Sequence, residues 1–154
     1  MSFLQSLHRR FMVGATEPGS SDEDVAALST FATRQGLVVP CDYLELVREV
    51  SELELVVDQR GCVRFWSASG VVEMNEAYEI QRHIPHALAV GDDEGGKALA
   101  FMDGGSGTGL YRFPFADPDA SEAVFIAPTI RELLKKGEGA DLLFDWMLQA
   151  DLEQ

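Results

Sequence analysis

The middle of the chain, from Leu88 to Phe113, constrains the fold most, because three short apolar runs there are separated by two glycine-rich turns. Such runs are typical of antiparallel strands joined by hairpins. In the second run, residues 98–102, apolar side chains occupy both alternating positions, which predicts a central strand covered on both faces. The first turn carries Asp92, Asp93 and Glu94. This segment therefore predicts a β-meander with a polar, acidic rim.

Helical patterns precede the meander. Ser21 followed by Asp24 resembles a capping box, and the apolar spacing after it predicts an amphipathic helix that ends near Gly36. Pro40 suits the first position of a second helix, which we expect to continue through Val50. The buried face of this second helix is predicted to comprise Tyr43, Leu46, Val47 and Val50.

Strand patterns surround these helices and the meander. From Leu53 the apolar period changes to two, which predicts a strand to Val57, a turn over 58–61 and a returning strand over 62–66. Residues 71–76 fit either a helical turn or a strand end, and residues 78–82 alternate as in a short strand. A last strand is expected over 124–126. Two helices follow it in this prediction, one from Thr129 to Lys136 and a final one that contains Leu142, Leu143, Trp146 and Ala150.

Together these patterns predict an α+β fold: a mixed, mostly antiparallel sheet of about six strands flanked by N- and C-terminal helices. The length of 154 residues fits one domain. Its core is expected over 22–137, with an N-terminal arm over 1–21 and a C-terminal helix over 140–151. Within the arm, residues 13–21 are predicted to be a loop, while Phe3, Leu4, Leu7 and Phe11 have helical spacing.

The net charge of −14, from 26 acidic against 12 basic residues, limits the classes of partner. Nucleic acids and anionic membranes are disfavoured, because both are bound through lysine and arginine. Among partners a basic protein is favoured, but on charge alone high solubility explains the composition better than a partner does. Residues 1–12 lack the apolar run of a signal peptide, and no stretch has the length of a membrane span, so we expect a cytoplasmic protein.

Catalytic and metal-binding patterns are weak. Cys41 and Cys62 lack the spacing of a zinc site and are expected to be reduced, half-buried thiols. Residues 91–98 approach a phosphate-binding loop, but Ala98 stands where a hydroxyl is required, and three carboxylates would repel phosphate. A calcium site in the same turn or at Asp103 lacks the alternating acidic ligands. We therefore expect no catalytic residue, no metal and no cofactor, and no enzyme activity.

The candidate residues for partner binding are Trp66, Asp92, Asp93, Glu94 and Asp103. A tryptophan at the end of a strand suits an interface anchor, because aromatic side chains dominate binding energy. The alternative for Trp66 is a place in the core, and the alternative for the acidic turn is a solvated hairpin tip. Both alternatives remain open from the sequence.

The order of several short motifs resembles the SUKH superfamily, which contains fungal cell-wall-synthesis regulators and bacterial immunity proteins of polymorphic toxin systems. The resemblance spans roughly residues 22–137. Ser51 and Glu52 depart from it, because many members have Asn-Gly after the second helix. The motifs that carry it are Val39-Pro40, Asp42-Tyr43-Leu44, Phe65-Trp66, Asn75, Ile84-Pro85, residues 88–96, Phe101-Met102-Asp103, Gly109-Leu110-Tyr111, Ala127-Pro128-Thr129 and Leu133-Leu134.

The resemblance implies an α+β fold without enzymatic activity. It also implies a protein-binding module that neutralises a toxin, often a nuclease. The acidic composition fits this role, because a nuclease needs a basic surface to hold phosphate and an acidic inhibitor complements that surface. The alternative function is a regulatory interaction domain or scaffold without a toxin partner.

Overall fold

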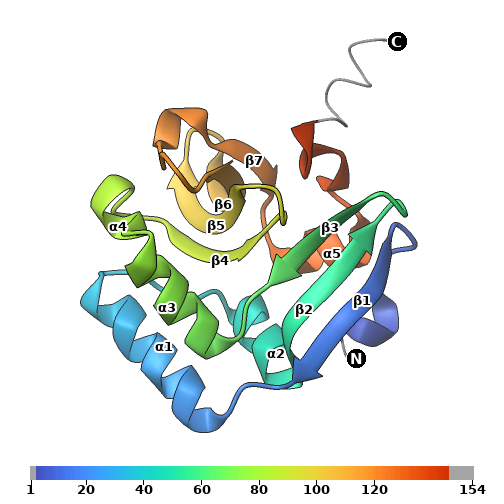
Figure 1. Ribbon diagram of the computed structural model, residues 1–154, viewed down its shortest axis with the longest axis horizontal. Coiled ribbons are helices and arrows are strands. Elements are labelled where there is room, and N and C mark those ends of the chain that lie inside the picture. Colours follow the sequence, from blue (N-terminus) through green and yellow to red (C-terminus); the bar gives the residue numbers. More distant parts are fainter. Residues whose placement is uncertain (1–2, 146–154) are drawn as a thin grey trace.

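The computed structural model describes residues 3–145. Seven strands form one sheet in sequence order, and each neighbouring pair is antiparallel (Figure 1). The α+β class is confirmed, with one strand more than expected and no parallel pair among the described residues. The strands are β1 (Phe11–Pro18), β2 (Val50–Val57), β3 (Gly61–Phe65), β4 (Leu88–Asp92), β5 (Lys97–Gly104), β6 (Gly107–Pro114) and β7 (Val124–Ala127).

The predicted meander is confirmed as strands β4, β5 and β6. Residues 98–102 of β5 are all buried, as expected for a strand covered on both faces. The turn between β4 and β5 contains residues 93–96, so the apparent phosphate-loop motif is a hairpin, with Lys97 already in strand β5. Strands β3 and β4 pair only through Arg64 with Asp92 and Phe65 with Gly91. This short pairing joins the β1–β3 ribbon to the β4–β7 part of the sheet.

The predicted loop over residues 13–21 is wrong for its first part, because residues 11–18 form the edge strand β1. Strand β1 pairs with β2, but register shifts between Val13 and Ala15 and between Ala15 and Glu17 interrupt the pairing. Only Phe11 is buried in this strand. Since bulges break the period of two and an edge strand buries little, the local sequence does not resemble a strand. The helical spacing of residues 3–7 corresponds to a 3₁₀ turn, η1 (Leu4–Ser6).

Helices α1 (Asp22–Arg34) and α2 (Cys41–Glu49) confirm the prediction for residues 21–50. The Ser21 side chain accepts a hydrogen bond from the backbone N–H of Asp24, which caps α1. Gly36 follows α1 with a φ of 72°, a left-handed conformation that favours glycine. Pro40 is the residue before α2, and Tyr43, Leu46, Val47 and Val50 are buried as expected.

Residues 68–83 form two helices, α3 (Ala68–Ala77) and α4 (Ile80–His83). The ambiguous segment 71–76 is therefore helical, and the predicted strand over 78–82 is wrong. Glu79 has a φ of 51°, which ends one helix and redirects the chain into the next. The alternation over 78–82 misled the prediction, because Ile80 is the buried residue of a single helical turn.

The C-terminal part contains η2 (Ala120–Glu122), α5 (Ile130–Lys136) and η3 (Ala140–Leu142). Thr129 caps α5 by accepting a hydrogen bond from the Glu132 N–H, as predicted. The predicted final helix falls mainly outside the described residues, because Trp146 and Ala150 are not among them. The part that is described, Ala140–Leu142, is a 3₁₀ turn.

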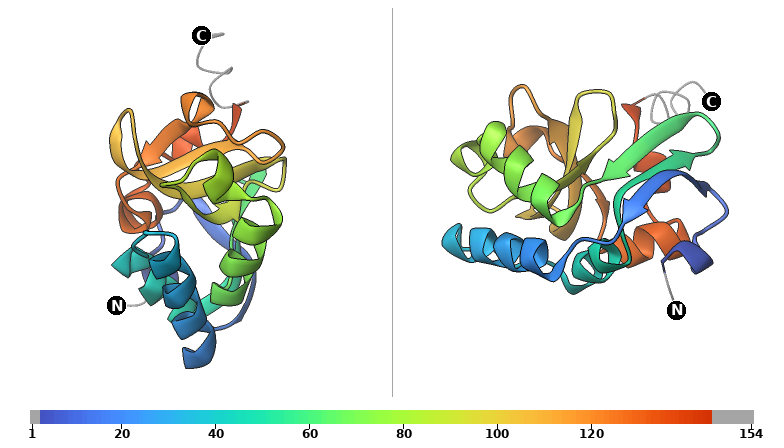
Figure 2. Two further views of the ribbon diagram at one scale, coloured as in Figure 1. Left: turned by 90° about the vertical axis from the view of Figure 1, so that its left-hand side faces the viewer. Right: turned by 60° about the horizontal axis from the view of Figure 1, so that its bottom comes forward.

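The helices lie against the sheet in two groups. Helices α1 and α3 contact each other (Figure 2), while α2 contacts both β2 and α5, and α5 contacts β7 (Figure 1). The buried apolar residues of all these elements form one cluster. None of the helices within residues 3–145 combines the length and the apolar character needed to cross a membrane.

Candidate partner-binding surface

The acidic turn between β4 and β5 is shaped by its own carboxylates. Asp92 Oδ1 accepts a hydrogen bond from the Glu94 N–H at 2.8 Å. Asp93 Oδ1 accepts two, from the N–H groups of Gly95 and Lys97, at 2.8 and 3.0 Å. Aspartate favours turns because its short side chain reaches backbone N–H groups nearby. The charge of this turn is therefore held in a defined position.

Trp66, which follows β3, is joined to the acidic turn. Its indole N–H donates a hydrogen bond to Asp92 Oδ2 at 2.8 Å, and its carbonyl accepts one from the Tyr43 hydroxyl at 2.7 Å. The residue is only 4% exposed. Such burial favours the core interpretation of Trp66, since its ring offers little area to a partner.

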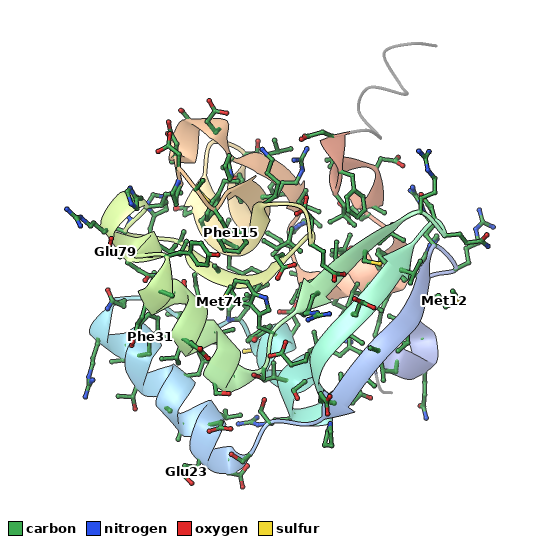
Figure 3. All side chains as sticks on the ribbon, viewed as in Figure 1. Met12, Glu23, Phe31, Met74, Glu79 and Phe115 are labelled. Atoms are coloured by element: carbon green, nitrogen blue, oxygen red, sulfur yellow. The ribbon has the colours of Figure 1, made fainter. Side chains whose placement is uncertain are left out.

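Two aromatic residues that the sequence analysis did not select lie beside the turn: Phe115, which is half-buried, and Tyr78, which packs against it. The Phe115 N–H donates to the Gly96 carbonyl at 3.0 Å, and the Phe115 ring lies 5.9 Å from that of Trp66, centre to centre. The Tyr78 ring lies 4.6 Å from the Phe115 ring, and Tyr78 is 43% exposed. Figure 3 labels Phe115 near Met74 of α3. We name Asp92, Asp93, Glu94, Tyr78 and Phe115 the acidic–aromatic surface.

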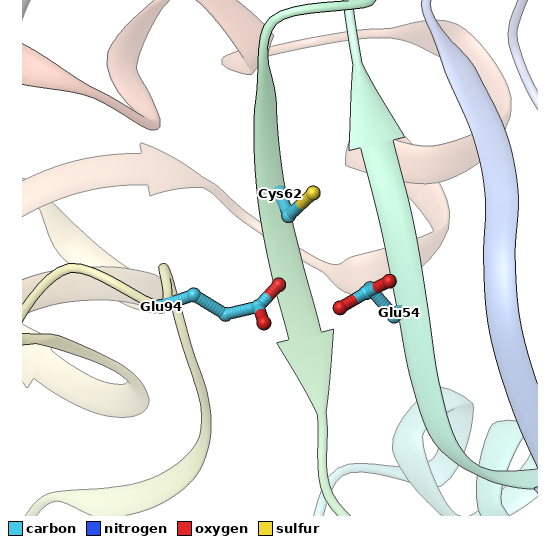
Figure 4. Close-up of side chains that lie close together, drawn as sticks. All are labelled: Glu54, Cys62 and Glu94. Carbon is cyan, nitrogen blue, oxygen red and sulfur yellow. The ribbon is translucent and has the colours of Figure 1, made fainter.

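Glu94 reaches across β3 toward Glu54 of β2, with Cys62 between them (Figure 4). The ligand atoms of these three side chains lie within 4.8 Å of one another, close enough to share a metal ion. A guanidinium already compensates part of this charge, because Arg64 Nη2 lies 3.1 Å from Glu54 Oε2 and 3.5 Å from Glu94 Oε1. A metal ion would have to displace this cation, so the geometry favours an ion-pair cluster.

The same cluster perturbs two ionisable groups. Desolvation, together with a hydrogen bond and the charge of Glu54, raises the pKa of Glu94 above its ordinary value. Desolvation also raises the pKa of the Cys62 thiol, and the charges of Glu94 and Glu54 act in the same direction. Raising the pKa of a thiol makes it less reactive at neutral pH. Cys62 is half-buried as predicted, whereas Cys41 is exposed, contrary to the prediction.

Asp103 does not belong to the acidic–aromatic surface. It lies five residues along β5 from Ala98, which pairs with Asp92, so about 17 Å of strand separates the two carboxylates. Asp103 is exposed and pairs across the hairpin with Thr108. Both residues line a groove at this other end of the sheet. Of the five residues selected from the sequence, the structure brings together Trp66, Asp92, Asp93 and Glu94.

Comparison with models of known protein families and with curated proteins finds no match to this chain. The resemblance to the SUKH superfamily therefore stays a prediction, which rests on the order of its motifs.

Proposed function

We propose that this protein is a non-enzymatic, cytoplasmic binding module for a basic protein, and that it acts as an immunity protein neutralising a toxin. The observation that carries the proposal is the acidic–aromatic surface. Carboxylates held in fixed positions attract a basic partner, and the exposed Tyr78 and the half-buried Phe115 supply apolar contact area. The resemblance of the sequence motifs to the SUKH superfamily further favours a nuclease toxin as the partner.

The net charge supports the same partner class. Arg64 lies within ion-pair distance of Glu94 and of Glu54, so its positive charge is already compensated. The excess negative charge of the molecule remains available to a partner. Complementary charges of this kind raise association rates by roughly 10–10³-fold at low salt.

The test uses variants that change charge without changing the turn. Asp93→Asn keeps an oxygen for the two backbone N–H groups, and Glu94→Gln keeps the length of the side chain. Asp92 is left unchanged, because an amide nitrogen in place of Oδ2 would face the Trp66 indole N–H and leave both donors unpaired. The control, Asp22→Asn with Glu23→Gln, removes the same charge from the start of α1, where Glu23 lies away from Phe115 (Figure 3).

The partner for the experiment is the product of the neighbouring gene, inactivated if it is toxic, with binding followed by surface plasmon resonance. The Asp93/Glu94 variant should associate about 10-fold more slowly and depend less on salt, while the dissociation rate changes less than about twofold. The control should behave as wild type. Unchanged association kinetics, or an equal loss in the control, would contradict the proposed surface. Binding without neutralisation of a toxic activity would instead indicate the regulatory interaction domain.

A further inference from the structure

A groove of about 490 Å³ lies at the end of the sheet opposite the acidic turn. The apolar surface of the groove comes from Leu88 of β4 and from Phe101 and Met102 of β5. It is also lined by residues 36–38 and Pro40, between α1 and α2, and by residues 128–129, before α5. A groove of this size accommodates a small ligand or a few side chains of a partner.

The connection between α1 and α2 holds an apolar side chain in solvent at this groove. Val38 is 88% exposed, more than any other large apolar residue within residues 3–145. The connection is anchored, because the Leu37 N–H donates to the Ala32 carbonyl at 2.8 Å. A fixed, exposed apolar residue beside an apolar groove extends the area that a partner can cover.

Two carboxylates, Asp42 and Asp103, and the imidazole of His86 line the groove. No lysine or arginine lines it among the described residues. Asp42 is held in place by the backbone N–H of Arg131, which donates to its Oδ2 at 3.1 Å. Asp103 is exposed at the end of β5. The groove is therefore complementary to an apolar group that carries positive charge beside it.

We propose that the groove binds a protruding segment of a protein partner in which an aliphatic side chain is flanked by lysine or arginine. The aliphatic side chain contacts Phe101, Met102 and Val38, and the flanking cations face Asp42 and Asp103. A second copy of this chain is a poor occupant, because each copy carries a net charge of −14. The inference goes beyond the proposed function, because this groove and the acidic turn lie at opposite ends of β5.

The test uses the full chain, labelled with ¹⁵N, and three acetylated, amidated pentapeptides with terminal glycines. The first has leucine between two lysines, the second serine between two lysines, and the third leucine between two glutamates. The first peptide should shift the backbone amide signals of Leu37, Met102 and Gly109 with a dissociation constant in the millimolar range. The second peptide should bind at least about 10-fold more weakly than the first, because it lacks the aliphatic side chain. The third should bind at least about 3-fold more weakly, because glutamates replace the flanking cations.

Variants separate this site from the acidic–aromatic surface. Asp103→Asn should weaken the first peptide about threefold, and Val38→Ser should weaken it further. The Asp93→Asn, Glu94→Gln variant and the exposed apolar control Val13→Ser should bind it as wild type does. Unchanged amide signals away from the groove verify that each variant keeps the native fold.

Five outcomes would overturn the inference. The first four are no shift at the groove, equal binding of the glutamate peptide, equal binding of a small neutral leucine amide, and concentration-dependent broadening of groove signals without peptide. The last two of these four would assign the groove to a small apolar molecule and to a second copy, respectively. Shifts confined to residues 92–96 would also overturn it, while leaving the proposed function intact.

Discussion

The side chain of Asn75 forms hydrogen bonds that strand β4 cannot form with β3. Its Oδ1 accepts from the Ala89 N–H, and its Nδ2 donates to the Ala89 carbonyl, at 3.0 and 2.8 Å. Asn75 Nδ2 also donates to the Val71 carbonyl, and Asn75 Oδ1 also accepts a hydrogen bond from Gln81 Nε2. Asn75 is fully buried. One side chain thus joins α3 to the middle of the sheet, where β3–β4 pairing is short.

Replacing Asn75 with alanine should lower the free energy of unfolding by about 2–4 kcal/mol. The change leaves the Ala89 N–H and carbonyl buried without partners and also creates a small cavity. Urea unfolding followed by circular dichroism measures the loss. Glu73→Ala, on the exposed side of α3, is the control and should change stability by less than about 0.5 kcal/mol. A loss below about 1 kcal/mol for Asn75→Ala would mean that water replaces the amide.

At the scale of elements, the edge strand β1 depends on contacts outside its own hydrogen-bond ladder. Arg10, just before β1, forms a two-point ion pair with Asp58 in the turn after β2, including Nε to Oδ1 at 2.9 Å. The Asp58 N–H also donates to the Arg10 carbonyl at 2.9 Å. Arg10 Nη1 lies 2.8 Å from Asp141 Oδ1. The start of β1 is therefore joined both to the β2–β3 hairpin and to η3.

Replacing Asp58 with asparagine should cost about 0.5–1 kcal/mol of stability at pH 7. Asparagine tolerates the left-handed φ of 52° at this position, so the turn is kept and the charge is lost. The hydrogen bond from Arg10 holds the pKa of Asp58 below its ordinary value in the folded state. The stabilisation is therefore complete above about pH 4, the unfolded pKa, and is lost as the pH falls through the folded pKa.

Chemical unfolding of wild type and Asp58→Asn between pH 2 and 7 measures this dependence. The two stabilities should converge at the acidic end of the range. Glu79→Gln, which breaks the exposed pair with Arg82, serves as control and should have little effect at any pH. A gap that persists unchanged at the lowest pH would place the effect in the turn conformation and not in the ion pair.

At the scale of the molecule, the net charge of −14 opposes folding through repulsion. On one face, desolvation first, and then the hydrogen bond with Glu54 and the charge of Glu54, raise the pKa of Glu94. Buried apolar residues from every layer form one cluster, which provides the opposing favourable term. The balance between the two depends on ionic strength, because salt screens exposed charges.

Raising sodium chloride from about 0.02 to about 0.3 M should raise the melting temperature by about 2–4 °C. Screening that is worth about 1 kcal/mol produces a shift of this size in a chain of this length. Differential scanning calorimetry measures it. Sodium sulfate at equal ionic strength should give at least the same rise. A melting temperature that falls with salt would mean that local ion pairs outweigh the general repulsion.

Part of this fold could be predicted because its signals are local. The meander from β4 to β6 pairs strands that are neighbours in the sequence, and glycine-rich turns mark its ends. The caps Ser21 and Thr129 act within three residues. The acidic turn was predicted for the same reason, since its charges and the hydrogen bonds that shape its backbone lie within residues 92–97.

The sequence by itself determined the α+β class, the central strand, the capped helices and the acidic turn, because each follows from residues a few positions apart. Only the tertiary structure decided that residues 11–18 form an edge strand and that Trp66 is buried. It also placed Phe115 and Tyr78 beside the acidic turn and Asp103 at a separate groove. The physical reason is that burial and contact between distant segments depend on how the layers pack, which no local periodicity specifies.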